Sequence, residues 1–474
     1  FSGTTATVTT SLAHGYANND WIEISGVDQL PYDGLFQITF INSTSFSYTM
    51  ASPPGVNATG ATMLARTSTR KMSYAYDSAG RISNASDPDS AYAYSYDSAG
   101  RLSSTDNNGT PNLPRVILTN LYNAASRRFA LISSVAGSSD FTNTYNYDNI
   151  GRMNNLSQSG TGIAQKRVDI VYDKSGQYSK ITRSSTTGSI TEVTHSDYAY
   201  DSAARLLSLV HRRPNNTALV TYSWTYDGQG RVKSFTNPDT TVTYSYDQAS
   251  QVTLADYAVG TDEPYAYDKS GNRTISGYTT GADNRLTSDG IYNYTYDAEG
   301  NRTRRTKISD STYIDYTYDY RNRLTDEVYR TSGGVKTKAL QYVYDVNDRR
   351  IERRLDATGD GTYESKERYI YDGEDIVLVY DGSNALINRY LHGPEFDQPL
   401  AEESATGVVK WELPDEQGSI RDMGDNPRLH VATYLFDGAH PRPILNQYDV
   451  THSMRIDNRL VCPRRVRRRQ RAPA

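Results

Sequence analysis

The chain has 474 residues and a formal net charge of −5, from 50 Lys+Arg and 55 Asp+Glu, which argues against a general nucleic-acid-binding protein. Its single cysteine, Cys462, excludes an internal disulfide framework, and no apolar run approaches the roughly 18 residues that a membrane-spanning helix needs. Tyrosine is in large excess, with 40 Tyr against 9 Phe and 3 Trp, so we expect a broad, thin sheet covered by tyrosine rings in preference to a thick aliphatic core.

Residues 1–66 are predicted to form a small β-sandwich or β-barrel module. Segments 5–10, 21–24, 35–40 and 45–49 are rich in β-branched or alternating apolar residues, and turn-forming Asn, Asp and Gly separate them. The first residue is Phe and not Met, and no signal peptide is visible, so we expect the chain to be a fragment or a processed product.

Residues 67–386 are predicted to be a repeat array. The stretch Tyr-Ala-Tyr-Asp-Ser-Ala-Gly-Arg at residues 74–81 returns almost unchanged at residues 94–101 and in weaker form further along the chain. Successive copies are 20 to 29 residues apart, a period typical of units that must stack on their neighbours to bury a face. Aligned on the residue after the second Tyr, the copies are at Asp77, Asp97, Asn123, Asp148, Asp173, Asp201, Asp227, Asp247, Asp268, Asp297, Asp319 and Asp345.

Each copy is predicted to be a β-hairpin. Two Tyr two residues apart place both rings on one face of a strand. The Asp that follows can accept hydrogen bonds from the backbone N–H groups just ahead of it, and the Gly three residues later suits a position with positive φ. Arg comes next in eight copies and is expected to begin the return strand. A structural turn role, and no catalytic role, is therefore assigned to Asp77, Gly80, Asp97, Gly100, Asp148, Gly151, Asp173, Gly176, Asp227, Gly230, Asp268, Gly271, Asp297 and Gly300.

This array resembles the YD repeats of RHS proteins, which include bacterial polymorphic toxins, the C components of insecticidal toxin complexes and the animal teneurins. Residues 389–400, Arg-Tyr-Leu-His-Gly-Pro-Glu-Phe-Asp-Gln-Pro-Leu, resemble the segment with which RHS arrays pass into their C-terminal core, and residues 413–422 resemble the stretch after it. The resemblance implies an all-β fold in which antiparallel hairpins form a large curved or spiralling sheet, a partial RHS shell. We assign residues 387–426 to the start of the core-like segment and residues 427–474 to an irregular basic tail.

The resemblance also implies a function. It favours a structural scaffold, a shell segment of a secreted or surface polymorphic toxin-type protein, with other shell segments or a toxin cargo as partners. The alternative is a cell-surface adhesion protein that binds glycans or another cell. Enzymatic activity is not expected: the 7 His have no ligand-spaced pair, no nucleophile-elbow, phosphate-loop or dinucleotide motif exists, and the Asp-Pro-x-Gly-type motif of self-cleaving RHS cores has no match after residue 426.

One acidic stretch has the spacing of a calcium loop. Counted from Asp356, oxygen-bearing side chains fall at positions 1, 3, 5, 9 and 12, with Gly at 6. No other cofactor is expected. The flanks are typical of strands and not of helices, so an ordinary hairpin tip is the alternative. The candidate calcium ligands are Asp356, Thr358, Asp360, Thr362, Glu364 and Glu367.

The array is too short to be a complete shell. Twelve hairpins give about 24 strands, which at roughly 4.8 Å per strand close into a cylinder about 37 Å across, with a bore too narrow for a folded domain of ~100 residues. We therefore expect an open, curved sheet with an accessible concave face and nothing enclosed.

Overall fold

The computed structural model describes residues 72–425 except 187, 396, 416 and 417, parts of residues 2–67, and residues 436–437 and 440–441. By its internal contacts the chain divides into residues 1–432 and residues 433–474. Almost all of the predicted basic tail therefore lies outside the described residues. Its two described strands, β37 (Phe436–Asp437) and β38 (His440–Pro441), pair with each other.

The N-terminal module is a five-stranded antiparallel sheet in the order β1-β4-β3-β2-β5. Alternate residues point to one side of these strands, and Val8, Ile22, Ile38 and Phe46 form a separate small core there. The expected segments each contain a strand, and a fifth strand follows them. The strands are β1 (Thr5–Thr9), β2 (Trp21–Ser25), β3 (Gly34–Asn42), β4 (Ser45–Thr49) and β5 (Leu64–Thr67).

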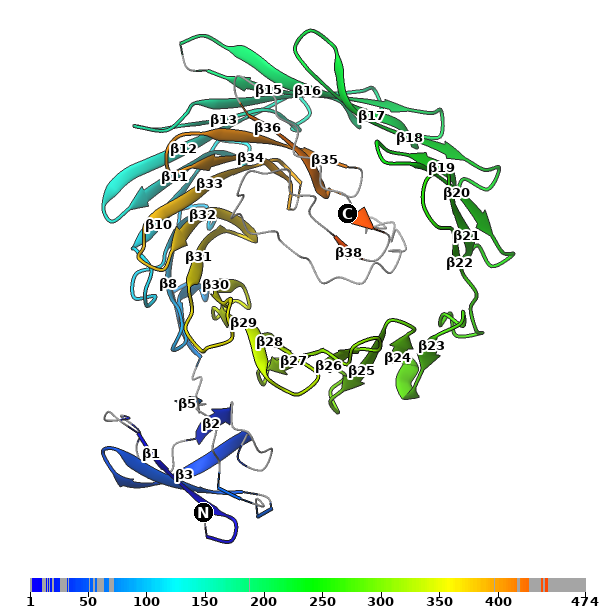
Figure 1. Cartoon of the computed structure of the whole chain (residues 1–474). Helices are drawn as coiled ribbons and strands as arrows, with labels where there is room; N and C mark the ends of the chain where they lie inside the picture. Colours follow the sequence, from blue (N-terminus) through cyan, green and yellow to red (C-terminus); the bar gives the residue numbers. More distant parts are fainter. Residues whose placement is uncertain are drawn as a thin grey trace. The chain divides into compact units, whose positions relative to one another are not determined.

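The repeat array forms a long antiparallel ribbon in two parts, and within each part every strand pairs with the next one along the chain (Figure 1). Its first part contains β6 (Ser73–Tyr76), β7 (Ile82–Ser86), β8 (Ala91–Tyr96), β9 (Leu102–Asp106), β10 (Val116–Tyr122), β11 (Arg128–Val135), β12 (Ser138–Tyr147), β13 (Met153–Ser159), β14 (Lys166–Tyr172), β15 (Tyr178–Ser185), β16 (Thr191–Tyr200), β17 (Leu206–Arg212), β18 (Ala218–Tyr226), β19 (Val232–Thr236), β20 (Thr241–Tyr246), β21 (Val252–Tyr257) and β22 (Glu263–Pro264).

The second part contains β23 (Tyr278–Thr280), a short 3-10 turn η2 (Ala282–Asn284), β24 (Leu286–Asp289), β25 (Tyr292–Tyr296), β26 (Arg302–Lys307), β27 (Tyr313–Tyr318), β28 (Leu324–Arg330), β29 (Lys336–Tyr344), β30 (Arg350–Asp356), β31 (Ser365–Asp372), β32 (Asp375–Asp381), β33 (Leu386–His392), β34 (Pro399–Ser404), β35 (Val409–Pro414) and β36 (Ile420–Asp425). Both sheets are open: within the described residues no strand register joins β22 to β6 or β23 to β36. The predicted all-β fold of antiparallel hairpins in a partial shell is confirmed.

The ribbon overlaps itself, which the sequence analysis did not foresee. Strands β30–β36 lie nearer the centre of the curve than β10–β17 and follow them (Figure 1). The facing sides of the two layers enclose one aliphatic core, in which Leu131, Leu156 and Ile181 of the outer layer join Leu378 and Trp411 of the inner layer. The expectation of a single thin sheet without an aliphatic core was therefore wrong for this part of the chain. Here the concave face of the first layer is covered.

Candidate functional site: the repeat turns and the pocket between the layers

The repeat turns share one hydrogen-bond pattern, seen first at Asp77. The backbone N–H of Asp77 donates to the carbonyl of Arg81 at 2.9 Å, and the N–H of Gly80 donates back to the carbonyl of Asp77 at 3.0 Å. The carboxylate oxygen Oδ1 of Asp77 accepts from the N–H groups of Ala79 and Arg81 at 2.9 and 3.0 Å. Its second oxygen, Oδ2, accepts from Nε of Arg81 at 2.7 Å. The carboxylate of Asp77 thus accepts three hydrogen bonds from within the turn and stabilises its conformation.

The residue three after each aligned Asp has positive φ in every copy. At the seven glycines φ runs from 76° at Gly80 to 92° at Gly300. Non-glycine residues take the same conformation at the other five turns, with φ between 58° and 66°, and so carry the strain of a left-handed backbone. These residues are Ser126, Ala204, Ser250, Asn322 and Asp348.

The arginine of the turn is also an electrostatic partner of the aspartate. Its side-chain hydrogen bond is the largest cause that holds the pKa of Asp77, Asp97 and Asp201 below the usual value. These carboxylates therefore remain ionised well into the acidic range. They have no free proton to donate at neutral pH, in keeping with the turn role predicted from the sequence.

Consecutive repeats are locked together by the second Tyr and the Arg, a contact that the sequence analysis missed. In nine places the Tyr hydroxyl donates to a backbone carbonyl of the previous repeat, at 2.6–2.9 Å. In all eight copies that have Arg, the guanidinium lies over the ring of the second Tyr of the following repeat, 4.3–5.7 Å from the ring centroid. The signal was present in the sequence, because Tyr before the Asp and Arg four residues after it recur together.

Several polar contacts tie the inner layer to the outer one. Nη1 of Arg128 on β11 donates to Asp372 on β31 at 2.6 Å, and Nε of Arg389 donates to Asp140 at 3.0 Å. Lys166 and Glu403 form an ion pair in which both side chains are fully buried. Another contact runs from Nε2 of His211 on β17 to the carbonyl of Pro414 on β35, at 2.9 Å.

His211 also has a serine partner, which makes it look like a catalytic base. The distance between Oγ of Ser196 and Nδ1 of His211 is 2.8 Å, but both residues are fully buried, so no substrate reaches the hydroxyl. Burial, followed by the nearby charge of Arg183, lowers the pKa of His211 to about 3. The ring is therefore neutral: Nδ1 accepts from Ser196 and Nε2–H donates to Pro414. This pair is structural.

The predicted calcium loop is only partly assembled. Carboxylate oxygens of Asp356, Asp360 and Glu364 lie within 4.8 Å of one another. Glu367 points elsewhere and accepts from the hydroxyl of Tyr369 at 2.8 Å. Nζ of Lys336 donates to Oδ2 of Asp356 at 2.7 Å.

The remaining bonds of the loop are local. Burial raises the pKa of Asp356, but the hydrogen bonds from Lys336, Gly361 and Gly359 outweigh it and hold the pKa below its usual value. The hydroxyl of Thr358 donates to Glu364 at 3.1 Å, and the N–H of Thr362 donates to Asp360 at 2.7 Å. A lysine ammonium thus already neutralises the one buried carboxylate, so of the two predicted alternatives we favour the ordinary hairpin tip.

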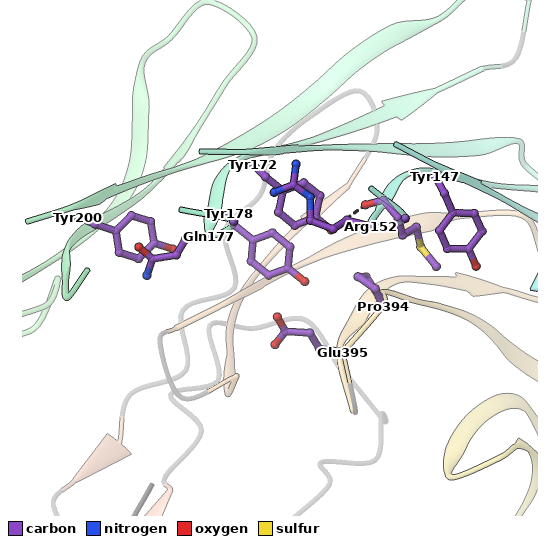
Figure 2. Close-up of a pocket in the computed structure, with 11 residues that line it drawn as sticks. Tyr147, Arg152, Tyr172, Gln177, Tyr178, Tyr200, Pro394 and Glu395 are labelled. Carbon is purple, nitrogen blue, oxygen red and sulfur yellow. Dashed lines mark hydrogen bonds between the residues drawn. The ribbon is translucent and has the colours of Figure 1, made fainter. Parts of the chain in front are cut away.

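A pocket of about 710 Å³ opens between the two layers at the turn ends of the outer one (Figure 2). Tyrosine rings from three consecutive repeats line it, and Pro394 and Glu395, from the loop after β33, lie on the opposite side. The hydroxyl of Tyr178 points toward the carboxylate of Glu395, to which it hydrogen-bonds (Figure 2). The residues that line the pocket are Tyr147, Gly151, Arg152, Met153, Tyr172, Gly176, Gln177, Tyr178, Tyr200, Pro394 and Glu395.

Comparison with known families identifies the array. Residues 68–388 match the family model of the teneurin YD-shell, which is more than half of the 474 residues. The chain belongs to the teneurin YD-shell family. The resemblance to YD-repeat proteins inferred from the sequence is therefore confirmed. No curated protein has a significantly similar sequence.

Solved structures agree with this family in fold. The crystal structure of TcdB2-TccC3 is 15% identical, with a TM-score of 0.57 over 86% of this YD-shell chain and 24% of that chain. The crystal structure of TcdB2-TccC3-Cdc42 is 13% identical, with a TM-score of 0.52 over 86% and 23% of the two chains. At these identities the likeness shows the fold alone, and this chain spans about a quarter of the length of either relative. Among the described residues no helix has the length and apolar character to cross a membrane.

Proposed function

We propose that this YD-shell chain is a wall segment of a secreted, toxin-type β-shell, and that it acts as a scaffold without catalysis of its own. The observation that carries the proposal is the overlap of the ribbon. A sheet that only displayed ligand-binding faces would not need a second layer fastened to the first by a fully buried ion pair, Lys166–Glu403. A curved wall that must keep its shape gains rigidity from such a layer.

The comparisons support the toxin class. The structural relatives are complexes of TcdB2 with TccC3, in which the matching part is about a quarter of a longer chain. We extend this to partners: further shell segments of the intact protein, or a cargo inside the finished shell. A secreted or cell-surface location follows from the same reasoning.

Electron cryo-microscopy of the natural full-length product tests the proposal. The expected result is a continuous shell in which β6–β36 form one stretch of wall and further strands pair with the free edges of β6 and β36. The contrary result is a ribbon with both edge strands unpaired and no enclosed lumen. If that open protein also bound cells or a glycan array, the adhesion alternative would replace the shell function.

A further inference from the structure

The repeat at Asp173 departs from the interlock of its neighbours. Gln177 stands where eight copies have Arg, and its Nε2 donates to the carbonyl of Ala204 in the next turn at 3.0 Å. Oδ1 of Asp173 accepts from the N–H groups of Ser175 and Gln177 at 2.8 and 2.9 Å, as in the other copies. Its second oxygen, Oδ2, accepts no hydrogen bond from any described residue. The guanidinium that fills this place elsewhere is missing.

The ring that this guanidinium would cover is Tyr200. In the preceding repeat, Arg152 lies 4.3 Å from the ring centroid of Tyr172, and the Tyr172 hydroxyl donates to the carbonyl of Met153 at 2.7 Å. No described arginine stacks on Tyr200, and its hydroxyl makes no hydrogen bond with the described part of the chain. Gln177 and Tyr200 both line the pocket between the layers (Figure 2). The vacant place therefore opens into a cavity.

The pocket is negatively charged at that place. Burial, then Tyr198 and the carboxylates of Asp173 and Glu395, raises the pKa of Tyr200 to about 12. At Tyr172, by contrast, the largest effect of a charge on the pKa comes from Arg152, which opposes the effect of burial. Glu395 forms no ion pair with any described residue. Two carboxylates thus lie near an uncovered aromatic face, and the arginine of the pocket lining, Arg152, is already paired with Asp148 and stacked on Tyr172.

The two copies with Asn in place of Arg fill the place themselves. Nδ2 of Asn272 donates to Oδ2 of Asp268 at 2.9 Å, and Nδ2 of Asn301 donates to Oδ2 of Asp297 at 3.0 Å. Gln177 does not bond to the aspartate carboxylate through its side chain, because its amide is directed to the next turn. The vacancy at Asp173 is therefore a property of this repeat and not of every repeat that lacks Arg.

We propose that the pocket between the layers binds a guanidinium group supplied from outside the repeat, the side chain of an arginine. The bound group stacks on Tyr200 as the arginines of eight other repeats stack on their tyrosines, donates to Oδ2 of Asp173, and is neutralised by Glu395 from the inner layer. A planar guanidinium suits both the aromatic face and the carboxylates, whereas an ammonium makes neither contact as well. Because Glu395 lies on the inner layer, such a ligand also bridges the two layers.

Isothermal titration of the full chain with L-arginine, N-acetyl-arginine amide and L-lysine tests the proposal. Both arginine compounds are expected to bind with millimolar affinity and lysine at least tenfold more weakly. Equal binding of the two arginine compounds means that the guanidinium alone is read. Tighter binding of the amide means that the pocket reads an arginine within a peptide. Either result supports the site, and absence of heat with both overturns it.

Two variants and a matched control locate the binding. Gln177→Arg restores the arginine of the other repeats, fills the vacancy and should abolish arginine binding. Gln251→Arg makes the same change in a repeat away from the pocket and should leave binding unchanged. Glu395→Gln should weaken binding roughly tenfold through the loss of a charge-assisted contact. If Gln177→Arg folds poorly, Glu395→Gln decides alone, and unchanged affinity in either variant refutes the site.

Discussion

The buried ion pair between the layers gives the sharpest test of how the wall holds together. Glu403 accepts from Lys166 and, at 3.0 Å, from the N–H of Ala164, and no part of either charged side chain reaches solvent. In Glu403→Leu the ammonium of Lys166 stays buried without its partner. Removing one member of such a pair costs about 3–5 kcal/mol in the free energy of unfolding.

The double variant Lys166→Met with Glu403→Leu separates charge from packing. With both charges gone, the main remaining loss is the unsatisfied N–H of Ala164, about 1–3 kcal/mol. The double variant should therefore be more stable than Glu403→Leu. A control is Lys307→Met, which removes a pair whose side chains are 42% and 44% exposed and should change stability by less than ~1 kcal/mol.

Urea denaturation followed through tryptophan fluorescence measures these differences, because Trp411, one of the 3 Trp, is a core residue of the inner layer. The expected order of midpoints, from high to low, is wild type with the Lys307 control, the double variant, then Glu403→Leu. If Glu403→Leu unfolded at the midpoint of the control, the inner layer would not pack on the outer one in solution, and the reasoning from overlap to wall would fail.

Three further predictions concern single sites. Gly100→Val forces a β-branched residue to φ 82° and should cost on the order of 1–2 kcal/mol in urea denaturation; an unchanged midpoint would contradict the turn geometry. Calorimetry with millimolar calcium should give no heat for wild type, because Lys336 already pairs with Asp356, and heat would restore the loop as a calcium site. Since the pKa of His211 is about 3 when folded and about 6.5 when unfolded, stability should be full above about pH 6.5 and fall toward pH 3, by at most ~1.4 kcal/mol per pH unit; His211→Gln should flatten this slope.

The hairpins were predictable because their determinants are local. Asp77, Gly80 and Arg81 lie within five residues of one another, and turn chemistry alone specifies their hydrogen bonds. The interlock of Tyr and Arg joins residues of adjacent repeats and was recoverable from their joint recurrence. Treating each copy separately hid it.

The overlap was not predictable from one sequence. Lys166 and Glu403 are 237 residues apart, and nothing in either neighbourhood marks them as partners. Their contact depends on the curvature accumulated over many strands, which local propensity does not set. The pocket also depends on the overlap, because Glu395 of the inner layer contacts Tyr178 of the outer layer only where the two layers lie against each other. The calcium spacing shows what a linear pattern leaves open: the carboxylates of Asp356, Asp360 and Glu364 come together, whereas strand β31 carries Glu367 away from them.

The overlap also makes the number of strands per turn a structural constant of this chain, and deleting one repeat tests it. Arg128 on β11 meets Asp372 on β31, twenty strands later. Twenty strands at roughly 4.8 Å give a contour of about 96 Å, to which the unpaired connection between β22 and β23 adds, so the wall is at least about 31 Å across. Adding repeats at either end lengthens the spiral without widening it.

Deleting residues 228–247 tests this geometry. The deletion removes β19 and β20 and should move Asp372 about 10 Å along the ribbon from Arg128. The contacts between the layers would lose register together, and the inner strands should then exchange their amide hydrogens much faster than in wild type. Replacing residues 228–247 by residues 78–97 keeps the length and both strands, so this control should retain wild-type protection. Equal protection in the deletion and the control would mean that the inner layer slides freely over the outer one, which fixed ion pairs do not permit.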